Sequence, residues 1–327
     1  MSDKKTESGI GQKFKNLFDT QRVGKGVKRE DLDLPFTFVN FFKYYFAHFN
    51  DIFRINLLLV FGNFPLFFGL FALTGYLNRN VSTAASYLFP QLYGARLISG
   101  GESLAFAALW NVHGIQSTAS FWTSLTYLFF GLTALVIFTF GLVNIGATYL
   151  MRNRLRRQPI FFWSDFFYAV KKNWKSGLLM GIVDAVLTGL FIYNILFSFM
   201  NAGTFISTLV FWGNIILLLI YFFMRFYIYI FLITFDLSFF KCIKNALIFA
   251  FLGIGRNFLA FLGIAAVLVL NYLIFSFLMP LGVMLPFVIT VGTCFYMSVY
   301  AAWPKVKELM IDPYYPDYDK DKDSEEE

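Results

Sequence analysis

The chain has 327 residues, of which 58% are hydrophobic and 14% are charged. Six long apolar blocks separated by basic stretches predict an integral membrane protein, because about 20 consecutive apolar residues cross the hydrocarbon core as a helix. The net charge of +7 does not indicate nucleic-acid binding, because the basic residues lie beside the apolar blocks. Membrane topology and anionic lipid headgroups explain basic residues at such positions.

The apolar blocks predict an all-α fold, a polytopic bundle of six transmembrane helices with interfacial amphipathic helices on the cytoplasmic side. Residues 1–34 are expected to form a flexible basic N-terminal tail, residues 35–305 a single membrane domain, and residues 306–327 an acidic disordered tail. The predicted spans are approximately 53–76, 121–150, 177–200, 204–234, 258–278 and 283–303, with an outside loop over 77–120.

The distribution of Lys and Arg predicts the orientation in the membrane. Residues 1–50 carry nine Lys or Arg, whereas the interval 77–120 carries only Arg79 and Arg96. Because positive charge marks the cytoplasmic side, both termini are expected inside the cell and the protein is expected in the plasma membrane.

Aromatic residues in the outside loop leave two interpretations open. Aromatic faces stack on sugars, and they also anchor loops at the membrane interface. The residues concerned are Tyr87, Phe89, Tyr93 and Trp110.

Segments of amphipathic character precede three of the expected membrane hairpins. In 160–175, aromatic residues and Lys residues occupy opposite faces at helical spacing, as a helix in the headgroup plane requires. Segments 236–251 and 35–50 resemble it, the last more weakly. Around the first of these segments we expect a basic patch facing anionic headgroups or a docking partner. It comprises Arg152, Arg154, Arg156, Arg157, Lys171, Lys172 and Lys175.

Two charged residues are predicted at membrane depth. Asp184 is eight residues into the third span, about 12 Å deep at 1.5 Å per residue. Arg225 lies on the fourth span, and the short turn between these spans places both residues at similar depth. An unpaired charge in lipid costs several kcal/mol, so an ion pair is expected. It is either a substrate- or proton-handling site or a structural pair that fixes helix register.

Small residues recur every four positions along the third span, and such a ridge lets another helix approach closely. Asp184 flanks this ridge. The members are Gly177, Gly181, Ala185 and Gly189. Other polar residues within the spans are expected to form hydrogen bonds between helices, namely Asn144, Asn194, Asn214 and Asn271.

No motif in the sequence indicates catalysis. There is no P-loop, and His48 and His113 are predicted on opposite sides of the membrane. Cys242 and Cys294 are predicted at different depths, so no metal-ligand spacing results. We therefore expect a non-enzymatic protein with no cofactor and no metal.

The stretch 141–184, with Gly146, Tyr149, Lys171–Lys172–Asn173 and Asp184, resembles the YesL-like family of bacterial membrane proteins, a domain of unknown function. The later FFKCIKNAL resembles that family's second cytoplasmic element. The resemblance implies a multi-span plasma-membrane protein. Since such members often lie in gene neighbourhoods for carbohydrate uptake and breakdown, it also implies a role beside sugar import.

Two functional hypotheses follow. The first is a non-enzymatic membrane protein accessory to an ABC-type carbohydrate importer, whose basic helices dock that partner or anionic lipid. The alternative is a small secondary transporter or channel that uses Asp184 and Arg225 as an internal polar site.

Overall fold

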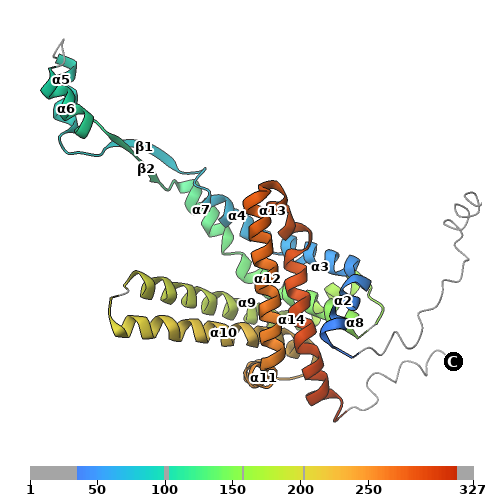
Figure 1. The fold of residues 1–327 in the computed structure, drawn as a ribbon. Coiled ribbons are helices and arrows are strands. Elements are labelled where there is room, and N and C mark those ends of the chain that lie inside the picture. Colours follow the sequence, from blue (N-terminus) through green and yellow to red (C-terminus); the bar gives the residue numbers. More distant parts are fainter. Residues whose placement is uncertain (1–34, 99–102, 157, 202, 315–327) are drawn as a thin grey trace, which may run out of the picture. The chain divides into compact units, whose positions relative to one another are not determined.

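The computed structural model describes residues 35–98, 103–156, 158–201 and 203–314, and most of these residues are helical (Figure 1). The expected tail at 1–34 and most of the expected tail at 306–327 lie outside the described residues. The chain divides into two compact units, Met1–Phe46 and Ala47–Glu327. In the first unit, the described residues contain most of helix α2, Phe38–Ala47.

The first expected span is broken. Helix α3, Phe49–Gly62, and helix α4, Pro65–Leu73, meet at a bend of 67°. Pro65 opens α4, and a proline has no N–H for the preceding helix and excludes its last turn sterically. The side chain of Asn63 donates to the carbonyl of Leu59, which binds one of the carbonyls left free at the end of α3. The prediction of one continuous helix over 53–76 is therefore wrong, although the two helices together are apolar enough for one broken span.

The expected outside loop contains regular structure. Strands β1, Arg79–Ala84, and β2, Gln116–Phe121, form an antiparallel pair with Arg79 opposite Phe121. Between them lie helices α5, Phe89–Ile98, and α6, Leu104–His113. The all-α prediction is therefore incomplete, because the described residues also contain this two-stranded sheet. The loop's aromatic residues contact one another: Phe89 stacks on Tyr93 at 5.7 Å, and its ring lies tilted against Trp110 at the same distance.

Three long helical stretches follow β2. The first comprises α7, Ser124–Thr133, and α8, Val136–Leu155; the next are α9, Phe162–Met200, and α10, Phe205–Thr234. Threonine side chains cap α7 and α10 in capping boxes that begin at Thr123 and Thr204. Helix α9 packs along both α8 and α10.

Most of the amphipathic segment 160–175 forms a helix of its own that meets the third span at a kink within α9. The backbone departs from helical geometry there at Asn173, with φ −116° and ψ 20°. The side chain of Asn173 donates a hydrogen bond to the carbonyl of Ala169, so this carbonyl has a hydrogen-bond partner at the kink. The expected change of direction therefore occurs inside the Lys171–Lys172–Asn173 sequence.

The last part of the chain contains α11, Phe239–Leu252, α12, Ile254–Phe277, α13, Met279–Leu285, and α14, Val291–Val306. Two short π-helical turns flank α14: η2, Pro286–Thr290, and η3, Lys307–Ile311. The helix thus continues to Ile311, past the expected domain end at 305.

Among the described residues, five helices are long and apolar enough to cross a membrane, or six if α3 and α4 form one span. The protein is therefore a helical multi-pass membrane protein. Its core lies around the second half of α10, where Tyr227 and Phe231 are fully buried. Ile145 of α8, Met180 of α9 and Trp303 of α14 are also fully buried.

Candidate functional site

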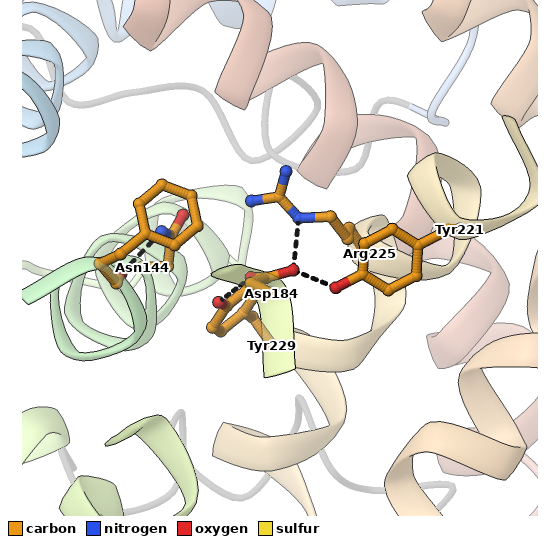
Figure 2. Close-up of polar contacts among 6 residues, drawn as sticks. Asn144, Asp184, Tyr221, Arg225 and Tyr229 are labelled. Carbon is orange, nitrogen blue, oxygen red and sulfur yellow. Dashed lines mark hydrogen bonds and ion pairs between the residues drawn. The ribbon is translucent and has the colours of Figure 1, made fainter. Parts of the chain in front are cut away.

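The structure brings Asp184 of α9 and Arg225 of α10 together. The Nε atom of Arg225 lies 3.1 Å from Oδ1 of Asp184 (Figure 2). The Asp184 side chain is 3% exposed and the Arg225 side chain 30% exposed. The carboxylate is therefore enclosed, whereas part of the guanidinium borders open space.

Two tyrosines complete the surroundings of Asp184. Tyr229 donates its hydroxyl to Oδ2 at 2.6 Å, and Tyr221 donates its hydroxyl to Oδ1 (Figure 2). A buried carboxylate is stable only when other groups replace the water that it has lost, and here two phenol donors and the charge of Arg225 do so. Neither tyrosine was predicted from the sequence as part of the site. Tyr221, Arg225 and Tyr229 recur at four-residue steps on α10, and this spacing is the signal that identifies them as one helix face.

The guanidinium of Arg225 keeps most of its donors free of protein partners. Its Cζ atom lies 5.2 Å from the ring centroid of Phe140, a cation–π contact. The two terminal nitrogens point away from Asp184 (Figure 2). Even Nε is not aligned for a hydrogen bond, so its contact with Asp184 is an ion pair. Within the described residues, no hydrogen bond uses the terminal nitrogens.

Arg225 lines a cavity of about 530 Å³ between α3, α4, α8, α10, α12, η2 and α14. Asp184 is not part of the cavity wall. The space is partly open to the outside of the helices and is not an enclosed void. The polar residues of the wall are Asn63, Asn144, Thr148, Arg225, Tyr229 and Ser298, and the remaining wall residues are mainly Leu, Val and Phe.

The neutral polar groups of the wall mostly bind their own helices. Asn144 donates to the carbonyl of Phe140 at 2.8 Å, and Thr148 donates to the carbonyl of Asn144 at 2.6 Å. Ser298 donates to the carbonyl of Cys294. Asn144 therefore bonds within its helix, contrary to the expectation of an interhelical bond. Arg225 remains the main source of uncommitted donors in the wall.

Asparagine residues also connect distant helices. Asn271 donates to the carbonyl of Gly282, so the expected bond between helices is present there. Asn214 instead donates to Val210 of its own helix. Asn56, which the sequence analysis did not single out, is fully buried and donates to the carbonyl of Phe287 at 2.6 Å. Its Oδ1 accepts from the N–H of Gly292 at 2.7 Å, which joins α3 to the start of α14.

Only the first half of the small-residue ridge, Gly177 and Gly181, packs closely against another helix among the described residues. A side chain at Gly181 would meet the carbonyl of Ile137 at 2.6 Å, and one at Gly141 would overlap the backbone of Gly177. The close approach is therefore between α9 and α8, with Gly141 as the partner that the sequence analysis missed. Nothing lies within 4 Å of a side chain built at Gly189, so the prediction that this residue packs is wrong. Ala185 is half-buried.

The predicted basic patch is only partly a surface feature. Arg152 is 5% exposed and donates to the carbonyl of Ile233 and the hydroxyl of Thr234. Its placement in a headgroup-facing patch is wrong, because its guanidinium binds the carbonyl end of α10, where helical carbonyls lack internal partners. Arg154 forms an ion pair with Asp51 at 2.5 Å. Arg156 is half-buried, Arg157 lies outside the described residues, and the exposed members are Lys171, Lys172 and Lys175.

The two cysteines lie in different environments. Cys242 of α11 is fully buried, and burial raises the pKa of its thiol. Cys294 lines the cavity. In the part of the chain that the structure describes, no three His, Cys, Asp or Glu side chains lie close enough to hold a metal ion.

One comparison with known proteins gives a match. Residues 120–195 match the model of a family described as a protein of unknown function, DUF624. No curated protein and no solved structure matches the chain. The match covers α7, α8 and most of α9, so it includes Asp184 but not Arg225. This part of the chain is therefore similar to DUF624, which is consistent with the resemblance to the YesL-like family and attaches no activity to the site.

Proposed function

We propose that the protein is a non-enzymatic, six-span protein of the plasma membrane that binds a small solute in the cavity beside Arg225 and acts as a small carrier or channel. The observation that carries this proposal is the charged guanidinium in the wall of a cavity of about 530 Å³. Small-molecule sites have volumes of about 300–1,000 Å³ and combine apolar walls with a few polar groups, which fits this cavity.

The cavity is also suited to transport because of the segments that surround it. The broken span α3–α4 and the π-helical turn η2 both contribute to its wall. Interrupted helices at membrane depth are typical of sites that bind and release solutes. Asp184 does not line the cavity, but its ion pair with Nε fixes the position of the Arg225 side chain in the cavity wall.

Uptake by the purified protein in lipid vesicles tests the carrier proposal. Vesicles with and without protein are given a defined mixture of monosaccharides, organic acids and fatty acids under a proton or sodium gradient, and the contents are measured by mass spectrometry. We expect at least one component to accumulate with the native protein. Asp184→Asn should abolish this accumulation, and Asp236→Asn, a matched change at an exposed residue, should retain it. Equal contents in vesicles with and without protein would contradict the proposal.

A second candidate is the accessory role in ABC-type carbohydrate uptake. The observation that favours it is the exposed group Lys171, Lys172 and Lys175 around the kink of α9. Such a group is suited to an acidic partner surface or to anionic headgroups on the cytoplasmic side. Gentle purification of the native protein with chemical crosslinking should recover importer subunits, and replacing the three lysines by Gln should reduce this recovery. Efficient uptake by the isolated protein would favour the carrier instead.

A further inference from the structure

The wall of the cavity has two chemically different parts. One part is the guanidinium of Arg225, whose terminal nitrogens point away from Asp184 (Figure 2). The other part is apolar and includes Leu66 and Leu70 of α4 and Phe287 of η2. A ligand that satisfies both parts must carry an acceptor at one end and hydrocarbon at the other.

Several apolar wall residues also contact the outside of the bundle. Leu66 is 43% exposed, Leu70 59% and Phe287 36%. The ring of Phe287 stacks on Phe67 at 5.7 Å, and both rings line the cavity. Because α4 and η2 belong to candidate spans, we expect their exposed side chains to contact lipid chains. The cavity is thus bordered by lipid-facing side chains, which provides a route from the bilayer.

The charge of the cluster restricts the acceptor. A guanidinium stays protonated in proteins, and a charge in an apolar environment requires a partner. Asp184 and Arg225 cancel formally, and two phenols further stabilise Asp184. One bound anion therefore brings the net charge of the cluster to −1, and two parallel bonds from the terminal nitrogens to a carboxylate or phosphate offset the hydration that this anion loses. A second negative charge on the ligand would bring the net charge to −2, and Arg225 is the one charged residue that the structure places in the cavity wall.

We propose that the cavity binds one amphiphile with a monoanionic headgroup, a carboxylate or a phosphodiester, whose charge pairs with the terminal nitrogens of Arg225 and whose hydrocarbon lies along α4 and η2. This inference rests on the proposed solute-binding function and names its ligand class. The headgroup chemistry is shared by fatty acids and anionic phospholipids, and both enter from the bilayer.

Native mass spectrometry of the full chain in neutral detergent tests the proposal. The probes are palmitate and phosphatidylglycerol, with hexadecanol and phosphatidylcholine as neutral counterparts. We expect a single adduct with at least one anionic probe, at an affinity about tenfold or more above its neutral counterpart, as a charge-assisted bidentate contact provides. Adducts with palmitate alone identify a fatty acid, and adducts with phosphatidylglycerol alone identify a phospholipid.

Three variants locate the binding. Arg225→Gln should remove the preference for the anionic probe, whereas Arg79→Gln, the same change at an exposed residue of β1, should leave it unchanged. Ser298→Phe fills the cavity without touching the ion pair and should abolish adducts of both classes. If Arg225→Gln fails to fold, Ser298→Phe still tests whether the adduct lies in the cavity.

The outcomes separate this inference from the proposed function. Equal binding of anionic and neutral probes, lost in Ser298→Phe, would overturn the anionic headgroup and leave a solute-binding cavity. An equal loss in Arg79→Gln and Arg225→Gln would also overturn it, because surface charge would then explain the preference. The absence of adducts with all four probes would overturn the inference, and the vesicle experiment would then decide the carrier proposal by itself.

Discussion

Asp184 is contacted by two phenol donors and one guanidinium, all from one face of α10. Tyr229 donates a hydrogen bond to Oδ2. Tyr221 donates a hydrogen bond to Oδ1, and Arg225 forms an ion pair with the same oxygen (Figure 2). Removing one partner of a buried charge costs more than the bond itself is worth, because the remaining group stays desolvated. The two phenols are therefore expected to stabilise the fold as well as to fix the carboxylate that holds Arg225.

Tyr229→Phe tests whether the phenol hydroxyl stabilises the fold. The substitution keeps the ring and removes the hydroxyl that donates to Asp184 at 2.6 Å. We expect the free energy of unfolding to fall by about 1.5–3 kcal/mol, the range for hydrogen bonds to charged groups. Unfolding in mixed micelles measures the change. Tyr193→Phe, at a tyrosine of α9 that is 64% exposed, is the control, and an equal effect of the two substitutions would contradict the assigned bond.

The thiol of Cys242 allows a second test at this scale. Burial raises its pKa, so at neutral pH its folded-state thiolate population is below that of a free cysteine. The thiolate is the form that reacts, and its fraction grows only as pH rises toward the raised pKa. We expect maleimide to leave Cys242 unmodified at pH 7 in the folded protein and to modify it after denaturation, as measured by peptide mass spectrometry. Fast modification at pH 7 without denaturation would show that the α11 environment is open.

At the scale of helices, the packing of α8 on α9 depends on glycine at particular positions. The sequence periodicity predicts a small-residue ridge, but it does not reveal which residues of the ridge meet another helix. Gly181 meets backbone atoms of α8, whereas Gly189 meets nothing within 4 Å. The difference depends on the tertiary partner Gly141, which lies 40 residues away from Gly181 in the sequence.

A matched pair of alanine substitutions measures this contact. Gly181→Ala places a Cβ atom 2.6 Å from the carbonyl of Ile137, so the helices must separate, and we expect a loss of about 1–3 kcal/mol in unfolding free energy. Gly189→Ala adds the same atom in open space within a helix and should be neutral or stabilising by up to about 1 kcal/mol. Both are measured by unfolding in mixed micelles. Equal destabilisation by the two would mean that the α8–α9 approach is not close.

At the scale of the whole molecule, the sequence predicts the helical membrane architecture well and its interruptions poorly. Apolar length identifies the candidate spans because lipid requires long stretches without charge. The π-helical turn η2 depends on packing, since Asn56 binds η2 and α14 from a distant part of the chain. The break between α3 and α4 has a local cause, Pro65, which the hydropathy of the block does not reveal. The sequence predicts Asp184 and Arg225 as a pair from their depth alone. The cavity requires side chains from seven elements, and no local pattern encodes it.

The orientation of the whole chain is the remaining prediction, and it rests on the Lys and Arg distribution. Positive charge concentrates in 151–175 and is sparse in 77–120, so the start of α9 should lie in the cytoplasm and the β1–β2 pair outside. Single cysteines at two exposed serines, Ser164→Cys and Ser82→Cys, report the two sides in a background where Cys242 and Cys294 are replaced by Ala. In intact cells, a maleimide that cannot cross the membrane should label Ser82→Cys only. After permeabilisation it should also label Ser164→Cys, because the lysine-rich start of α9 then becomes accessible. The reverse pattern would invert the topology and place Lys171, Lys172 and Lys175 outside, where neither a cytoplasmic partner nor the anionic cytoplasmic leaflet reaches them.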